Sequence, residues 1–87
     1  MKLTFSETGW ADYLYWQSED RKTLKRINQL LQDIERNQNN GLGKPEPLRG
    51  NLTGFYSRRI DEKNRLVYQF QNDCFEIIQC RGHYGDK

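Results

Sequence analysis

Residues 55–80 read FYSRRIDEKNRLVYQFQNDCFEIIQC, and this stretch decides the fold class. It contains three runs rich in β-branched and aromatic residues, at 55–60, 65–70 and 74–80. Polar turns separate the runs. Consecutive strands joined by such short turns pair antiparallel, because a parallel pair needs a crossover of a dozen or more residues. The stretch therefore predicts a three-stranded antiparallel meander.

The residues at the N-terminal side predict one strand followed by a helix. KLTF at 2–5 indicates a short strand. Ser6 is a candidate N-cap, and Glu7 places a carboxylate in the first helical turn, where the helix dipole favours it. One apolar face then follows at helical spacing: Trp10, Tyr13 and Leu14.

A second helix gives the clearest periodic signal in the chain. It is expected over about 19–36, with Ser18 as a candidate cap. Its apolar stripe is Leu24, Ile27, Leu30, Leu31 and Ile34. Residues 37–54, rich in Asn, Gly and Pro, then predict a long loop, and such loops are often functional. The order β-α-α-β-β-β predicts one α+β domain over residues 1–87, with both helices on one face of a mainly antiparallel sheet.

The composition indicates a small, polar, globular domain. The chain has 87 residues, 34% of them hydrophobic, and a net charge of +2, which does not by itself indicate a nucleic-acid binder. Cys74 and Cys80 would lie about 20 Å apart along one strand, too far for a disulfide. Their spacing fits no metal or redox motif. We expect reduced thiols, no metal, no cofactor, and a cytoplasmic protein without a membrane anchor.

Alternation along the meander predicts the two faces of the sheet. A tight turn at 72–73 would place three pairs on an apolar face that suits the helices: Phe70 with Phe75, Tyr68 with Ile77, and Leu66 with Gln79. The other face would carry Arg65 with Cys80, Val67 with Ile78, and Gln69 with Glu76. A slip of one residue would exchange the faces.

Several arginines gather near this second face. Arg58 and Arg59 point to opposite sides of their strand, so one of them joins Arg65. Arg81 lies at the end of the last strand. A guanidinium group suits phosphate oxygens. The alternative is that these are solvated edge charges that discourage aggregation.

Two residues are candidates for proton transfer. Glu46 stands between two prolines in GKPEPL, which hold it extended. It is either a general base or a solvent-facing residue of a rigid spacer. His83 is the only histidine, and strand alternation turns it away from Arg65 unless Gly82 breaks the strand.

Together, a carboxylate, a histidine, arginines and a tyrosine suit RNA cleavage without a metal. A base removes the proton of the ribose 2′-hydroxyl, cations stabilise the developing charge, and an acid protonates the leaving 5′ oxygen. An aromatic residue such as Tyr84 stacks on a base. A serine or cysteine hydrolase fits worse, because no nucleophile, base and orienting group can be assembled around one histidine.

The sequence resembles the Txe/YoeB family of toxins, within the RelE-like superfamily of toxin–antitoxin systems. The resemblance covers nearly the whole chain and rests on KLTFSETGWADYLYWQ, GKPEPL, LTGFYSRRIDEKNRLVY and CRGHY. It implies a RelE-like microbial RNase fold and a ribosome-dependent mRNA endoribonuclease that cuts the codon in the ribosomal A site. It also implies a cognate antitoxin, a homodimer, and operon repression in which operator DNA is bound through the antitoxin complex.

Position in these motifs implies a role for each site residue. Glu46 would be the general base, His83 the general acid and Arg65 the main phosphate-stabilising cation. Tyr84 would orient the substrate or stack on it. Further charge would come from the substrate-binding residues Lys44, Arg49 and Arg59, although the family usually has lysine at the position of Arg49.

A second hypothesis is a non-catalytic interaction module of the same fold. It would bind the antitoxin and act in operator repression, or inhibit another target as gyrase-poisoning relatives do. The joint presence of Glu46, Arg65, His83 and Tyr84 favours the enzyme, because a purely binding module needs none of them.

Overall fold

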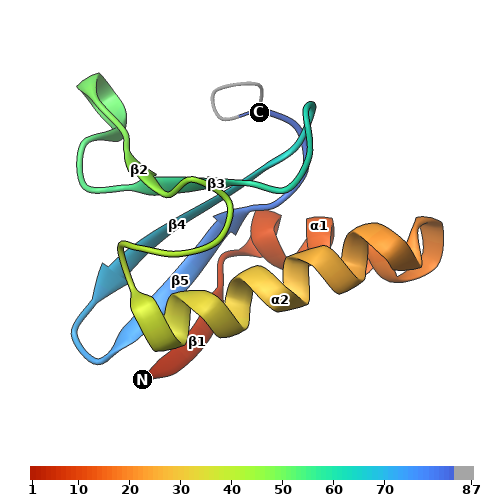
Figure 1. The fold of residues 1–87 in the computed structure, drawn as a ribbon, viewed down its shortest axis with the longest axis horizontal. Coiled ribbons are helices and arrows are strands. Elements are labelled where there is room, and N and C mark those ends of the chain that lie inside the picture. Colours follow the sequence, from red (N-terminus) through yellow and green to blue (C-terminus); the bar gives the residue numbers. More distant parts are fainter. Residues whose placement is uncertain (84–87) are drawn as a thin grey trace.

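The structure, a computed structural model, describes residues 1–83 and places two helices on one face of a five-stranded sheet (Figure 1). The elements in chain order are β1 (Lys2–Phe5), α1 (Glu7–Glu19), α2 (Arg21–Asn37), β2 (Glu46–Pro47), a 3-10 turn (Gly50–Leu52), β3 (Tyr56–Arg59), β4 (Arg65–Gln71) and β5 (Cys74–Gln79). Within the described part of the chain, no helix has the length and apolar character that a membrane crossing requires.

The sheet has the strand order β1-β5-β4-β3-β2, which confirms the predicted α+β fold and the meander β3-β4-β5. The strand β1 pairs parallel with β5, and the two helices follow β1 in the chain. The prediction of a continuous loop over 37–54 is wrong at Glu46 and Pro47, which form the edge strand β2 against β3. Proline is tolerated there because an edge strand leaves one row of its backbone groups unpaired.

The helix α1 begins as predicted but buries a different face. The Ser6 hydroxyl accepts a hydrogen bond from the N–H of Gly9 at 3.0 Å. The residues that α1 buries are Gly9, Asp12 and Trp16. The predicted apolar face is confirmed only for Tyr13, which packs against the core, and is wrong for Trp10 and Leu14, which are 47% and 42% exposed. The helix approaches β5 so closely that a methyl group at Gly9 would collide with the carbonyl of Ile77.

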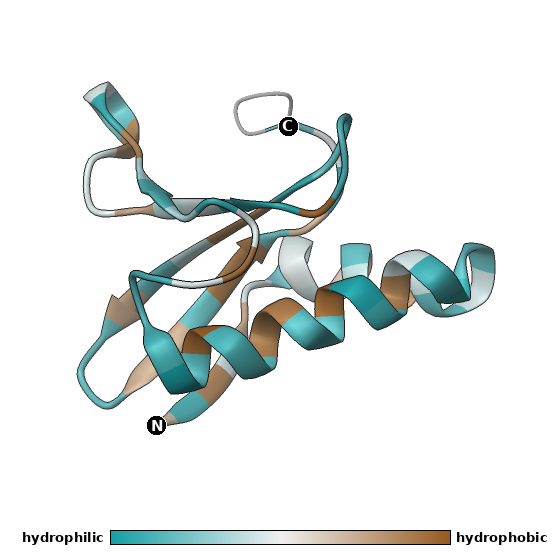
Figure 2. Cartoon of the chain, in the orientation of Figure 1, coloured by the Kyte–Doolittle hydropathy of each residue, from teal (hydrophilic) through white to brown (hydrophobic). Residues whose placement is uncertain are grey.

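The helix α2 supplies most of the helical core, as its periodicity predicts. Its buried residues Ile27, Leu30, Leu31 and Ile34 pack with residues of the sheet, chiefly Leu66, Tyr68, Phe75 and Ile77. Figure 2 shows the apolar bands that recur along α2. The predicted cap at Ser18 is wrong, because its hydroxyl bonds to the carbonyl of Tyr15 within α1. Asp20 is the N-cap, and hydrogen bonds from the hydroxyl and N–H of Thr23 lower the pKa of its carboxyl.

A β-bulge changes the register near the end of β5. Three predicted pairs are confirmed: Phe70 with Phe75, Tyr68 with Ile77, and Gln69 with Glu76. Val67 then pairs with Gln79, which leaves Ile78 as an extra residue. The predicted pairs beyond this point are therefore wrong: Leu66 with Gln79, Val67 with Ile78, and Arg65 with Cys80. The bulge reverses the alternation, so Cys80 lies in the core, and neither Cys74 nor Cys80 forms a disulfide.

Candidate active site

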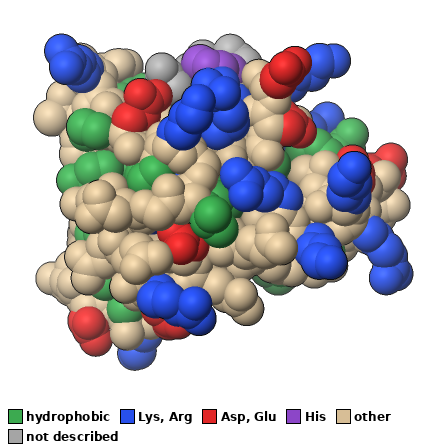
Figure 3. Space-filling view, viewed as in Figure 1, with side chains coloured by type: hydrophobic (Ala, Val, Ile, Leu, Met, Phe, Trp, Pro, Cys, Tyr) green, Lys and Arg blue, Asp and Glu red, His purple; other side chains and the backbone are tan. Residues whose placement is uncertain are grey.

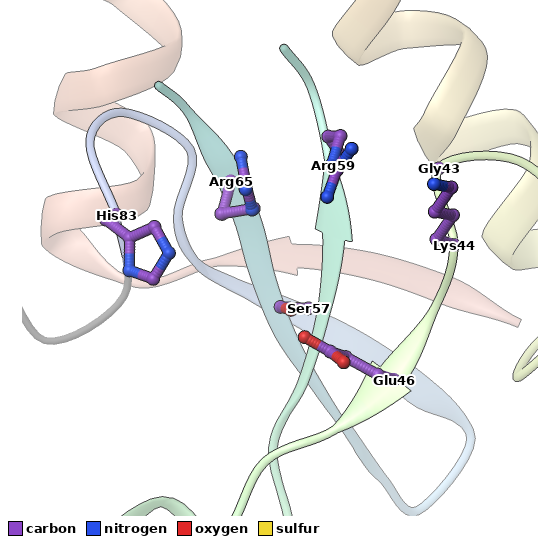
Figure 4. A pocket seen from close by; sticks show the side chains of 7 residues that line it. All are labelled: Gly43, Lys44, Glu46, Ser57, Arg59, Arg65 and His83. Carbon is purple, nitrogen blue, oxygen red and sulfur yellow. The ribbon is translucent and has the colours of Figure 1, made fainter. Parts of the chain in front are cut away.

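A polar pocket opens over β2, β3 and the start of β4 (Figure 4). It is lined by Gly43, Lys44, Glu46, Ser57, Arg59, Arg65 and His83. Five of the residues singled out from the sequence are among them: Lys44, Glu46, Arg59, Arg65 and His83. Arg49 does not line this pocket, and Tyr84 lies outside the described residues. Residues from four separate segments of the chain therefore meet at one place.

The strand β3 sends its two arginines in opposite directions. Arg59 is exposed and lines the pocket with Arg65. Of the two arginines on β3, it is therefore Arg59 that joins Arg65. Arg58 is fully buried and forms an ion pair with Asp33 of α2. Its guanidinium also donates to the Tyr68 hydroxyl at 3.0 Å. Further acceptors are the carbonyls of Gln38, Asn40 and Leu42.

The loop after α2 is therefore anchored to the core before it reaches the pocket. Directly after the loop carbonyls that Arg58 binds, the carbonyl of Gly43 accepts a hydrogen bond from the N–H of Arg59 at 2.6 Å. Lys44 then has a φ of +52°, in the left-handed region that residues other than glycine seldom occupy. These contacts fix the path of the chain immediately before Glu46.

Glu46 lies on the edge strand β2, where it pairs with Ser57 of β3. Its extended backbone confirms the expectation from the flanking prolines. The side chain is exposed, and Figure 4 shows its carboxylate pointing across the sheet towards Ser57. Ser57 was missed in the sequence analysis, although strand alternation places it on the face of Arg59 two residues later.

His83 reaches the pocket because the chain turns at Gly82, which has a φ of +80°. The N–H of Arg65 donates to the Gly82 carbonyl at 2.9 Å. The side-chain amide of Gln79 donates a hydrogen bond from Nε2 to the backbone carbonyl of His83 at 3.2 Å. In Figure 4, His83 and Glu46 lie on opposite sides of the pocket, and Arg65 and Arg59 line its upper part. Figure 3 shows the histidine at the edge of the molecule, beside basic side chains.

The guanidinium group of Arg65 rests on the turn between β3 and β4. Its Nη1 donates to the carbonyl of Asp61 at 2.6 Å and to that of Asn64 at 3.2 Å. Arg81 does not join the pocket, since its guanidinium lies 3.6 Å from the centroid of the Tyr15 ring on α1. Two arginines and one lysine therefore supply the positive charge of the pocket.

The end of β5 is held by two residues one turn apart on α1. The Asp12 carboxylate accepts a hydrogen bond from the N–H of Cys80 at 3.0 Å, and the Trp16 indole donates to the carbonyl of Cys80 at 2.8 Å. Cys80 precedes the turn that carries His83 by two residues. Asp12 was not predicted from the sequence, where its only signal is its place one turn before Trp16.

The arrangement places a carboxylate, an imidazole and several cations around one pocket. Such a set can accept a proton, donate a proton and stabilise negative charge on an oxyanion. Of residues 1–83, no three or more His, Cys, Asp or Glu side chains are grouped so that they could hold a metal ion. The guanidinium and ammonium groups that line the pocket suit an anionic group such as a phosphate.

Comparisons with known proteins show the family to which the chain is similar. A model of the family described as YoeB-like toxin of bacterial type II toxin–antitoxin system matches residues 5–84. Toxin YoeB of Escherichia coli (strain K12) is 54% identical over 84 residues, which cover 97% of this chain and 100% of that protein. The solved YoeB/ParE toxin from Agrobacterium tumefaciens has a TM-score of 0.94 at 43% identity, over 97% of this chain and 100% of that chain.

A further similar protein is YoeB of Staphylococcus aureus, solved as a dimer and as a heterotetrameric YoeB-YefM toxin–antitoxin complex. Both structures have a TM-score of 0.89 at 47% identity, over 97% of this chain and 98% of the solved chain. Sequence and fold agree over nearly the full length in each comparison. This chain belongs to the YoeB-like toxin family of bacterial type II toxin–antitoxin systems.

Proposed function

We propose that this chain is a ribosome-dependent mRNA endoribonuclease that cleaves the codon in the ribosomal A site and so inhibits translation. The observation that carries the proposal is the pocket that brings Glu46 and His83 together around Arg65. Cleavage by the neighbouring 2′-hydroxyl needs a base, an acid and positive charge at one phosphate. The three groups come from distant parts of the chain. Their meeting in one pocket is expected of an active site and is not expected of charges that are merely solvated.

In the proposed reaction, Glu46 accepts the proton of the ribose 2′-hydroxyl, whose oxygen attacks the adjacent phosphorus. The bond from phosphorus to the 5′ oxygen breaks, and His83 donates a proton to that oxygen. The products are a 2′,3′-cyclic phosphate and a 5′-hydroxyl. Arg65 stabilises the charge on the non-bridging oxygens. Each proton transfer contributes about 10²- to 10⁴-fold to the rate.

The remaining residues bind and orient the RNA in this proposal. Lys44 and Arg59 line the pocket beside the reacting phosphate and add positive charge. Arg49 contributes charge outside the pocket, and Tyr84 stacks on a base or orients it. An arginine presents several N–H donors in one plane, whereas a lysine presents a compact ammonium group. Arg49 would therefore bind a phosphate with a different geometry from the lysine usual in the family.

The exposure of the site residues supports the proposed dependence on the ribosome. Glu46, Arg59 and His83 are all exposed, so the pocket does not enclose a flexible RNA. In-line attack requires the 2′-oxygen, the phosphorus and the leaving oxygen to be aligned. We infer that the ribosome supplies this alignment by holding the codon in the A site.

We also propose that the toxin is a cytoplasmic homodimer that a cognate antitoxin neutralises. The Staphylococcus aureus relative, solved as a dimer and with YefM, supports this part of the proposal. Repression of the operon would occur through operator DNA bound by the toxin–antitoxin complex. The site of action would be the cytoplasm, where translating ribosomes are found.

Primer extension on an mRNA, with and without ribosomes, tests the proposal. The wild-type protein is expected to cut within the A-site codon only when ribosomes are present, and Glu46→Ala and His83→Gln are expected to lose this activity. Glu35→Gln, a change at an exposed carboxylate of α2, is the matched control and should cleave normally. Cleavage in neither condition would favour the non-catalytic module, and full activity of both site variants would reject the assigned residues.

A further inference from the structure

The turn between β3 and β4 holds the segment that carries His83. The side-chain oxygen of Asn64 accepts a hydrogen bond from the N–H of Gly82 at 2.7 Å. The N–H of the next residue, Arg65, donates to the carbonyl of Gly82 at 2.9 Å. Both peptide groups of Gly82 are therefore bound to this turn, directly before His83.

Asp61 fixes the orientation of the Asn64 amide. The Nδ2 of Asn64 lies 3.1 Å from each oxygen of the Asp61 carboxylate. An ionised carboxylate only accepts hydrogen bonds, so the amide nitrogen must face it and the amide oxygen must face Gly82. The Asp61 carboxylate also accepts hydrogen bonds from the N–H groups of Lys63 at 2.8 Å and Asn64 at 2.7 Å.

The charge state of Asp61 supports this orientation. Burial alone would raise the pKa of its carboxyl, but the hydrogen bonds from the side chain and backbone of Asn64, and from the backbone of Lys63, outweigh that effect and lower it. Asp61 therefore stays ionised at neutral pH. Its backbone carbonyl meanwhile accepts a hydrogen bond from the guanidinium of Arg65. One short turn thus contacts the guanidinium of Arg65 and the backbone next to His83.

We propose that Asn64 is a positioning residue for RNA cleavage, whose side chain holds the Gly82 turn in the conformation that brings His83 into the pocket. This inference rests on the proposed function, because the position of His83 affects a rate only if the pocket is catalytic. Asn64 does not line the pocket and carries out no proton transfer itself.

The backbone at Gly82 makes such an anchor necessary. A glycine has the largest choice of backbone conformations of any residue, and here it is held at a φ of +80°. Without the hydrogen bond to Asn64, Gly82 keeps its carbonyl contact to Arg65 but gains freedom at its N–H side. A small displacement of a catalytic group is enough to lower a rate about 10²-fold.

The variant Asn64→Ala tests the inference with two measurements. Hydrogen exchange at the Gly82 amide, followed by NMR, should become about tenfold faster, as expected for one lost hydrogen bond. The single-turnover rate of mRNA cleavage at saturating ribosomes should fall about 10- to 100-fold, with ribosome affinity unchanged. The matched control is Asn28→Ala, which removes an asparagine that accepts from the Tyr13 hydroxyl away from the pocket, and it should change neither value.

A charge exchange separates positioning from a general loss of stability. Asn64→Asp keeps the acceptor for Gly82 but sets a second carboxylate against Asp61, so it should be as slow as Asn64→Ala. Combining it with Asp61→Asn restores one donor and one acceptor between the two side chains, and the cleavage rate should recover. This pair also serves if Asn64→Ala does not fold.

The outcomes distinguish the inference from the function on which it rests. Faster Gly82 exchange with an unchanged cleavage rate overturns the inference, as does unchanged exchange in an active protein. Failure of the charge exchange to restore the rate also overturns it. A wild-type protein that does not cleave ribosome-bound mRNA rejects the proposed function instead. Hydrogen exchange at the Gly82 amide still decides in that case whether Asn64 holds the turn.

Discussion

The buried ion pair between Arg58 and Asp33 should contribute strongly to the stability of the fold. We expect Asp33→Ala to lower the free energy of unfolding, because it leaves a fully buried guanidinium without its counter-ion. It also removes the acceptor for the N–H of Leu42 at 2.9 Å. The loop that leads to the pocket would then lose part of its attachment to α2.

The structure sets the size of this effect. Removing one partner of a buried ion pair costs about 3–5 kcal/mol. The side chain of Asp33 is 14% exposed, and Arg58 keeps the Tyr68 hydroxyl and three carbonyls as acceptors, so we expect the lower end, about 3 kcal/mol. Asp33→Asn keeps an acceptor and should cost less, about 1–2 kcal/mol. The total free energy of unfolding of a native protein is only about 5–15 kcal/mol, so either loss would be a large fraction of it.

Urea denaturation followed by tryptophan fluorescence measures these values. Glu35→Gln removes an exposed carboxylate from the same helix and should change the free energy of unfolding by less than about 0.5 kcal/mol. A loss below about 1 kcal/mol for Asp33→Ala, with an unchanged denaturant slope, would refute the reasoning, because the guanidinium would then not need its counter-ion.

The contribution of Asp33 to the free energy of unfolding should depend on pH in a definite direction. Burial would raise the pKa of Asp33, but the hydrogen bond from Arg58, with those from Leu42 and Asn37, outweighs it and lowers the pKa in the folded state. Stability from this group is therefore present above the unfolded pKa, about 4, and is lost as the pH falls through the lower folded value. The difference between wild type and Asp33→Asn should be constant from pH 7 to about 5 and shrink below about pH 4.

Three further substitutions test how the site is supported. Gly9→Ala should destabilise the protein by about 1–3 kcal/mol in thermal unfolding, because its methyl group meets the Ile77 carbonyl, and an unchanged Tm would contradict the close approach of α1. Tyr68→Phe removes the hydroxyl that accepts from Arg58 and should cost about 1–2 kcal/mol in urea, whereas a neutral result would mean that this contact is dispensable. Gly82→Ala forces a side chain into left-handed backbone at a cost of about 1–2 kcal/mol and should slow single-turnover cleavage, so full activity would show that the turn is not needed.

Local patterns predicted most of the fold. The three strand runs, the stripe on α2 and the Ser6 cap depend on neighbours in the sequence, and all are confirmed. The same holds for the extended backbone at Glu46, which its prolines impose. Features that depend on tertiary contact were not predictable in the same way. Ile78 becomes a bulge through the pairing of β4 and β5, which no single strand encodes.

In the site too, features set by local sequence were predictable and features set by tertiary contacts were not. Alternation required Arg58 and Arg59 to point to opposite faces, but which of them is buried depends on tertiary partners such as Asp33 of α2. On α1, helical spacing from Trp10 suggested burial of Trp10 and Leu14, whereas the helix buries Gly9, Asp12 and Trp16 against the sheet. The polar residues that support His83, such as Asn64, carry no sequence signal, since their partners are backbone groups distant in the chain.

The central claim is that this pocket cleaves RNA through the 2′-hydroxyl of the substrate. The most direct measurement places a single 2′-deoxynucleotide at the cleavage position of an mRNA bound in the ribosomal A site, and compares its single-turnover cleavage with that of the all-ribose mRNA. The account predicts loss of cleavage at that bond, because Glu46 then has no hydroxyl to deprotonate. Cleavage of the substituted bond at the rate of the ribose substrate would contradict the account.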